Sequence, residues 1–188
     1  MPDSNHNTEP LRAGAHAAAS LLVLDTNVVL DWLVFRDPRC GPFVDALEAG
    51  RAHWLATVAM RNELMHVLAR GSLAAWQPDF DAIAITHRRL GHLIEASGTP
   101  SPPRLRCTDR DDQKFIDLAA QLGNACVLSR DRAVLKLARR AREAGFAILT
   151  PEAWSSIATG ELTPQSAPAP ARSGVQRAAH SLRSSGSD

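Results

Sequence analysis

Four acidic positions are spaced so that alternating strands and helices could bring them together. The first is Asp25, which directly follows the apolar run 21–24. The others are Glu63, the run 109–112 with three aspartates in four residues, and Asp131. Convergent carboxylate oxygens are the ligands that hard divalent cations such as Mg²⁺ and Mn²⁺ prefer. Such a site can activate water for the hydrolysis of phosphate esters.

Each acid also has a structural interpretation. Asp25 can cap the helix that follows it. The run 109–112 can stabilise the start of a helix through the helix dipole, and Glu63 can face solvent or pair with Arg61 or Arg70. However, a cap needs one acid, and three acids in four residues repel one another. The excess of negative charge therefore favours a bound cation.

The elements that position these acids are predicted from apolar patterns. Residues 21–24 form an unbroken apolar run, which is typical of a parallel strand buried on both faces. Residues 126–128 form a second such run, followed by Ser129 and Asp131. Ligands bind at the carboxyl edge of open α/β sheets. If the two strands are parallel, Asp131 lies near Asp25.

The rest of the chain alternates between predicted strands and helices. Strands are expected at 53–56 and 146–149. Helices are expected at 28–35, 41–49, 57–70, 80–96, 109–121 and 131–144, with a last one after the cap Thr150. This alternation predicts an α/β fold, a three-layer α/β/α sandwich around a parallel sheet, over residues 21–160. Residues 1–20 are expected to be a disordered leader. Residues 161–188, rich in Ser, Ala, Pro and Gly, are expected to be a disordered tail.

Bulk properties exclude several function classes. The net charge of +1 gives no general argument for binding nucleic acid or membranes. The three cysteines form no Cys-x-x-Cys pair, so no disulfide framework or thiolate zinc site is expected. This cysteine usage fits a reducing cytoplasm. No run of eighteen apolar residues is present, so no membrane span is expected, and no secretory signal is recognised. Trp32, Trp54 and Trp154 lie in apolar patterns and are expected in the core, whereas Trp76 is expected to be exposed.

Several motifs, taken in order, resemble the PIN-domain ribonucleases. The matching segments are Leu24-Asp25-Thr26-Asn27, Arg61-Asn62-Glu63-Leu64, residues 108–115, Leu128-Ser129-Arg130-Asp131, and residues 148–154. The third and last segments resemble the branch of the family described as toxin components of toxin–antitoxin systems. Together the segments cover about residues 21–157.

The resemblance implies metal-dependent hydrolysis of RNA phosphodiesters, with Mg²⁺ or Mn²⁺ as cofactor. The implied metal ligands and catalytic residues are Asp25, Glu63, Asp112 and Asp131. Asp109 can share or replace the role of Asp112, and the choice among Asp109, Asp111 and Asp112 stays open. Asn27 and Ser129 match positions that hold the water or phosphate of the site.

The expected partners are an RNA substrate, an antitoxin protein and a second copy of the chain. Arg132, Lys136 and Arg139 share a face of the predicted helix 131–144, which can contact a phosphate backbone. The two long helices at 57–70 and 80–96 are the expected dimer surfaces. An aspartyl phosphatase would need an acid at position 27, where the chain has Asn27. The alternative that stays open is a non-catalytic module of the same fold that binds protein or RNA.

Overall fold

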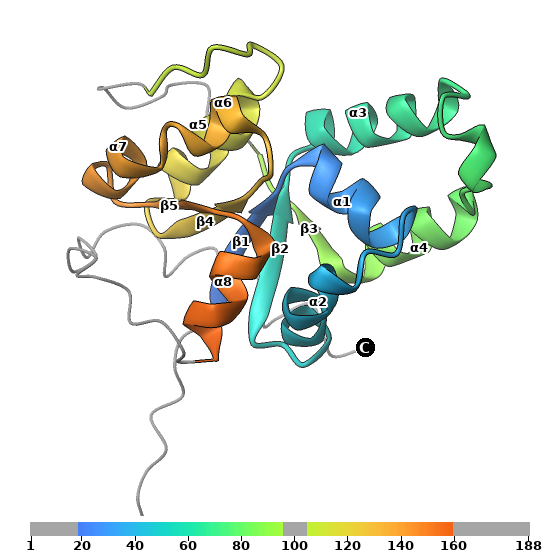
Figure 1. The fold of residues 1–188 in the computed structure, drawn as a ribbon, viewed down its shortest axis with the longest axis horizontal. Helices are drawn as coiled ribbons and strands as arrows, with labels where there is room; N and C mark the ends of the chain where they lie inside the picture. The colour runs from blue at the N-terminus through green and yellow to red at the C-terminus, as the bar shows by residue number, and fades with distance from the viewer. Residues whose placement is uncertain (1–18, 96–104, 160–188) are drawn as a thin grey trace, which may run out of the picture.

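A five-stranded parallel sheet forms the centre of the protein (Figure 1). The structure is a computed structural model, and it describes residues 19–95 and 105–159. The strand order is β3-β2-β1-β4-β5. The strands are β1 (Ser20–Leu24), β2 (Ala52–Ala56), β3 (Gly91–Leu93), β4 (Ala125–Leu128) and β5 (Ala147–Leu149). The predicted α/β fold with a parallel sheet is confirmed.

Helices connect successive strands on both sides of the sheet. They are α1 (Thr26–Leu33), α2 (Gly41–Glu48), α3 (Val58–Ala69), α4 (Phe80–Leu90), α5 (Gln113–Leu122), α6 (Arg132–Leu135), α7 (Ala138–Glu143) and α8 (Pro151–Ala158). Two short 3₁₀ helices, η1 (Pro38–Cys40) and η2 (Ala74–Trp76), lie in the connections. No helix within 19–95 or 105–159 is long and apolar enough to cross a membrane.

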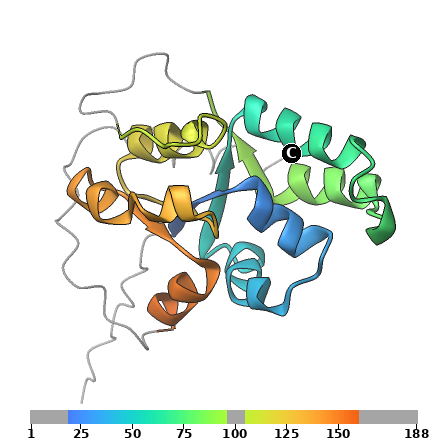
Figure 2. The ribbon, with the colours of Figure 1, turned by 45° about the horizontal axis from the view of Figure 1, so that its top comes forward.

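Alternate residues of β1 and β4 pack into two separate cores. Leu22 and Leu24 of β1 pack in one core with residues of α1, α2, α3, α4 and α8. Val23, between them, packs in the other core with residues of α5, α6 and α7. Figures 1 and 2 show these two groups of helices on opposite sides of the sheet. The sheet is therefore the middle layer of the predicted three-layer sandwich.

The sheet register places two acidic positions at neighbouring strand ends. β1 pairs with β4, and Leu24 lies opposite Leu128. The Asp25 amide then donates to the Leu128 carbonyl over 3.0 Å, and the Ser129 amide donates to the Leu149 carbonyl over 3.0 Å. The residues that follow β1 and β4 thus meet at one edge, as the apolar runs predicted.

Three predicted helices differ from the observed ones. The helix predicted at 80–96 ends at Leu90, and β3 follows at Gly91 as an edge strand. The helix predicted at 109–121 begins only at Gln113, so the acids 109–112 precede it. The helix predicted at 131–144 is two helices, α6 and α7, because Lys136 and Leu137 form a turn between them.

The other outcomes concern residues at the surface and the chain ends. Trp54 and Trp154 are buried, Trp32 is partly buried against the same core, and Trp76 is exposed, as predicted. The apolar spacing within 57–70 predicts Val58 on the core face of that helix, but Val58 is 51% exposed. β1 begins at Ser20, and residues 1–18 of the expected leader and the expected tail 161–188 lie outside the described residues.

Candidate acidic active site

Asp25 is the most buried acid of the site, with 1% of its surface exposed. It ends β1 and caps α1, because its Oδ1 accepts a hydrogen bond from the Asn27 amide over 3.2 Å. Its Oδ2 accepts a hydrogen bond from the Ser129 hydroxyl over 2.6 Å. Burial raises the pKa of Asp25, and the bonds from Ser129 and Asn27 oppose that rise. The structural and functional interpretations of Asp25 are therefore compatible.

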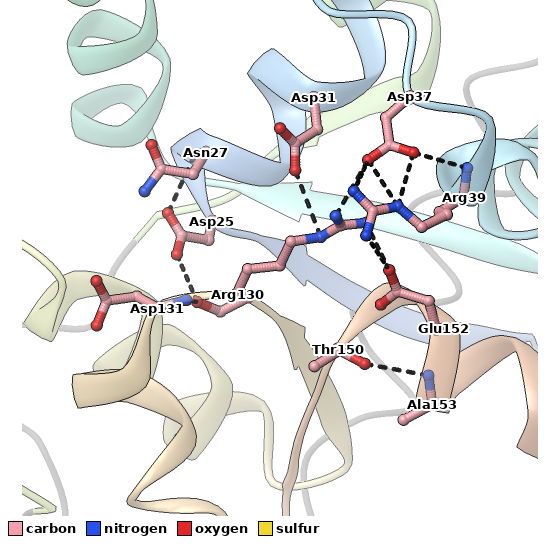
Figure 3. A network of polar contacts seen from close by, with 11 residues as sticks. Asp25, Asn27, Asp31, Asp37, Arg39, Arg130, Asp131, Thr150, Glu152 and Ala153 are labelled. Carbon is pink, nitrogen blue, oxygen red and sulfur yellow. Dashed lines mark hydrogen bonds and ion pairs between the residues drawn. The ribbon is translucent and has the colours of Figure 1, made fainter.

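Ser129 links Asp25 to Asp131. The Ser129 side chain is fully buried, and its oxygen accepts a hydrogen bond from the Asp131 amide over 3.0 Å. Asp131 in turn caps α6, because its Oδ1 accepts from the Ala133 amide over 2.6 Å. Figure 3 shows Asp25 and Asp131 on adjacent segments. The hydroxyl of Ser129 thus fixes the backbone that carries the second acid.

The acid-rich turn 109–112 is folded by its own contacts and by Gln113. Asp109 accepts a hydrogen bond from the Asp111 amide over 2.9 Å. Gln113 accepts from the Cys107 amide and donates to the Leu105 carbonyl, both over 2.8 Å. These two hydrogen bonds join the start of α5 to the preceding loop and so fix the position of the turn 109–112. Asp109 and Asp111 are exposed, whereas Asp112 is partly buried.

Asp112 is the member of this turn that interacts most with the other acids. Its pKa is raised to about 6, first by burial and then by the negative charges of Asp25, Asp109 and Asp131. The charge of Asp131 and that of Glu63 also raise the pKa of Asp25. The structure therefore places Asp131 and Glu63 within electrostatic reach of Asp25, and Asp25 and Asp131 within electrostatic reach of Asp112.

Glu63 forms an ion pair that the sequence analysis did not predict. Its partner is Lys114 of α5, rather than Arg61 or Arg70. The side chains of Lys114 and Glu63 are 24% and 31% exposed. The Lys114 ammonium also donates to the Asp111 carbonyl. This contact joins α3 to the acid-rich turn.

The carboxylates are close, but their oxygens do not form a single coordination shell. Within 19–95 and 105–159, no group of three or more His, Cys, Asp or Glu side chains is arranged to hold a metal ion. Asp25, Asp131 and Glu63 are each engaged by a protein donor. The negative charges of Asp25, Asp109 and Asp131 nevertheless add to burial in raising the pKa of Asp112, and carboxylate oxygens are the donors that Mg²⁺ and Mn²⁺ prefer. The residues therefore fit a hard divalent cation in chemistry and in charge.

Comparison with known proteins identifies the family. The PIN domain family model matches residues 21–133, which is more than half of the chain. The chain belongs to the PIN-domain family. PIN domains are generally nucleases that act on RNA, and they typically use divalent metal ions. No curated protein and no solved structure matches the chain significantly.

In this PIN domain, Arg130 joins three elements behind the acids. Its guanidinium lies 3.4 Å from Asp31 of α1, 3.1 Å from Asp37 before η1, and 2.9 Å from Glu152 of α8. Arg39 binds Asp37 and Glu152 from the solvent side, with its own side chain 60% exposed. Figure 3 shows the Arg130 side chain pointing away from Asp25 into this group. We call these five residues the Arg130 network. It anchors the loop between Ser129 and Asp131.

The predicted basic face of the PIN domain is interrupted. Arg132 lies in α6, Lys136 ends that helix, and Arg139 lies in the separate helix α7. All three are exposed, but Arg139 pairs with Glu143 over 2.9 Å. A single helical face that presents all three cations to RNA, as predicted, is therefore not formed.

Three site residues were missed as functional positions: Gln113, Lys114 and Arg130. Lys114 and Arg130 lie inside the motifs that resemble the family, but no spacing rule gives their partners. Arg130 contacts Asp31, which lies 99 positions earlier, and Lys114 contacts Glu63, which lies 51 positions earlier. A cation directly before the acid of one motif, as in Ser129-Arg130-Asp131, was the available signal.

Proposed function

We propose that this protein is a metal-dependent endoribonuclease that hydrolyses RNA phosphodiester bonds with Mg²⁺ or Mn²⁺. The observation that carries the proposal is the set of four acids at one sheet edge, which come from the residue after β1, from α3, from the turn before α5 and from the segment after β4. The charges of Asp131 and Glu63 raise the pKa of Asp25, and the charges of Asp25 and Asp131 raise the pKa of Asp112. Membership of a family of nucleases supports this reaction class.

Asp25, Glu63, Asp112 and Asp131 would hold the cation, with Asp109 as a further candidate ligand. When bound, a divalent ion activates water and stabilises negative charge on phosphate oxygens. Ser129 keeps Asp25 oriented through its hydroxyl. Asn27 is exposed two residues after Asp25, where its amide side chain can contact water or a phosphate oxygen. No protein nucleophile is required.

We further propose that the activity belongs to the toxin of a toxin–antitoxin pair in the cytoplasm. This proposal rests on the resemblance of residues 108–115 and 148–154 to that branch of the family. An antitoxin would need to cover the acidic edge.

We also propose that the chain forms a homodimer through α3 and α4. Exposed apolar side chains on these helices support it, since such surfaces are typical of interfaces. They include Val58, Met65, Phe80 and Ile85. Ile85→Lys would then reduce the mass measured by light scattering to that of a monomer. An unchanged dimer would place the interface elsewhere.

The experiment for the catalytic proposal measures Mn²⁺ binding by calorimetry and cleavage of a mixed pool of single-stranded RNA. The parent is compared with Asp25→Asn, Asp131→Asn and the control Asp45→Asn, which changes an acid of α2. We expect the first two variants to lose both binding and cleavage and the control to keep both. Metal binding by the parent without cleavage of any RNA would favour a non-catalytic binding module. Equal Mn²⁺ binding by all four proteins would refute the assignment of the ligands.

A further inference from the structure

Lys114 places a positive charge inside the group of acids. Its ammonium pairs with Glu63 and donates to the carbonyl of Asp111. It also lies 4.7 Å from the centre of the Phe115 ring, a favourable position for a cation. Since Phe115 is 1% exposed, this ring is part of the core and limits where Lys114 can move.

The influence of Lys114 on the acids is opposite to that of its neighbours. Asp25, Asp109 and Asp131 favour the protonated form of Asp112, whereas Lys114 favours the charged form. Lys114 is the one cation among the main influences on Asp25 and Asp112 in the described part of the chain. It therefore acts as an internal counter-ion of the site.

A divalent cation bound to Glu63 would share that carboxylate with the ammonium. The two positive charges would repel each other across one side chain, in a region where the site is partly shielded from solvent. Either the ammonium leaves Glu63 or the ion binds more weakly. The observed pairing also explains why the Glu63 oxygens do not join those of the other acids in a common shell.

We infer that Lys114 competes with the divalent cation for Glu63 and so sets the metal affinity of the site; this inference rests on the proposed function. Removing the positive charge without changing the length of the side chain should strengthen metal binding. For one unit charge next to a dication, we expect Lys114→Met to tighten Mn²⁺ binding about tenfold. Lys114→Arg keeps the charge and should bind Mn²⁺ as the parent does.

The protein contains one other lysine, Lys136, which provides the matched control. It is exposed and makes no ion pair among the described residues. Lys136→Met changes the net charge by the same amount as Lys114→Met. Isothermal calorimetry with Mn²⁺ alone, on the full chain, measures the affinity of all four proteins. Circular dichroism confirms that each variant is folded, and Lys114→Gln replaces Lys114→Met if the latter is not.

A metal-free measurement tests the ion pair itself. The changes in melting temperature for Lys114→Met, Glu63→Gln and the double variant give the coupling between the two side chains. We expect non-additive changes for this pair. Additive changes would overturn the inference at its first step, because the two side chains would then not interact in solution.

The outcomes separate the inference from the proposed function. Tighter binding by Lys114→Met, with Lys114→Arg and Lys136→Met unchanged, supports the competition. Equal or weaker binding by Lys114→Met, or equal tightening by Lys136→Met, overturns it and leaves the metal site in place. If neither the parent nor any variant binds Mn²⁺, the proposed function fails and the inference fails with it.

Discussion

The hydrogen bond from the Ser129 hydroxyl to the Asp25 carboxylate links the residues that follow β4 and β1. Removing this bond gives a sharp test of the site. Ser129→Ala deletes the hydroxyl that donates to the Asp25 carboxylate over 2.6 Å and accepts from the Asp131 amide over 3.0 Å. Both Ser129 and Asp25 are buried. Water therefore cannot replace the lost donor without a change in the surrounding packing.

The expected magnitude follows from the two bonds. A hydrogen bond to a charged group contributes about 1.5–3 kcal/mol, and a neutral one about 0.5–1.5 kcal/mol. We expect Ser129→Ala to lower the free energy of unfolding by about 2–4 kcal/mol at pH 7.5. Ser155→Ala is the matched control, since Ser155 donates to the Pro151 carbonyl over 2.9 Å within α8. That neutral bond should contribute about 1 kcal/mol.

The assay is urea unfolding of metal-free protein, followed by circular dichroism at several pH values. The Ser129 donor stabilises the charged form of Asp25 and opposes the rise in pKa that burial causes. The difference between Ser129→Ala and the parent should therefore shrink as the pH falls and Asp25 becomes protonated. A loss no greater than that of Ser155→Ala, or a loss independent of pH, would refute this account of the site.

Three further predictions concern the other charges of the site. Burial raises the pKa of Asp25, so the folded protein binds the proton of this carboxyl more tightly than the unfolded chain does. The free energy of unfolding therefore falls as the pH rises above 3.8. At pH 7, the free energy of unfolding of metal-free Asp25→Asn in urea should match that of the parent or exceed it by up to about 2 kcal/mol. The pKa of Asp112 is about 6, so the parent should lose stability between about pH 4 and pH 6 as this carboxylate forms, and Asp112→Asn should show a flatter profile; parallel profiles would contradict the shift. Arg130→Met leaves three carboxylates facing one another and should lower the melting temperature by several degrees more than Arg39→Met, which removes the exposed member of the same network; equal melting temperatures would show that the buried guanidinium contributes nothing beyond its neighbour.

The parallel sheet and its acidic edge were predictable because they depend on local pattern. The apolar run before Asp25 and the run before Ser129 each fill a strand with both faces buried, which is the pattern typical of a parallel sheet covered by helices. The caps at Thr57 and Thr150 were likewise predictable, since each side chain accepts from an amide three residues later. These features are decided within a few positions of the chain.

The edge strand β3 was missed because its pattern is weak. It is three residues long, and its first residue, Gly91, is also the C-cap of the preceding helix α4. Its identity depends on pairing with β2, where Gly91 lies opposite Trp54. Apolar periodicity alone continues the helix to residue 96. Pairing between strands far apart in sequence supplies the information that the local pattern lacks.

The partners of the site residues were unpredictable for the same reason. Local spacing offers Arg61 and Arg70 to Glu63, whereas the fold brings Lys114. The division of the helix 131–144 is also tertiary, since Leu137 between α6 and α7 is buried in the core. The positions of the acids follow from strand ends, but the donors that engage them follow from how the helices pack.

The Arg130 network also bears on how far the chain can be shortened without loss of the site. The family match ends at residue 133, before β5 and α8. Yet β5 covers the outer edge of β4, and Glu152 of α8 holds the loop between Ser129 and Asp131. In a chain shortened to the matched residues, β4 would be an unpaired edge strand, whose free backbone groups promote aggregation. The segment that matches the family model is thus shorter than the segment that must fold to hold the acidic residues in place.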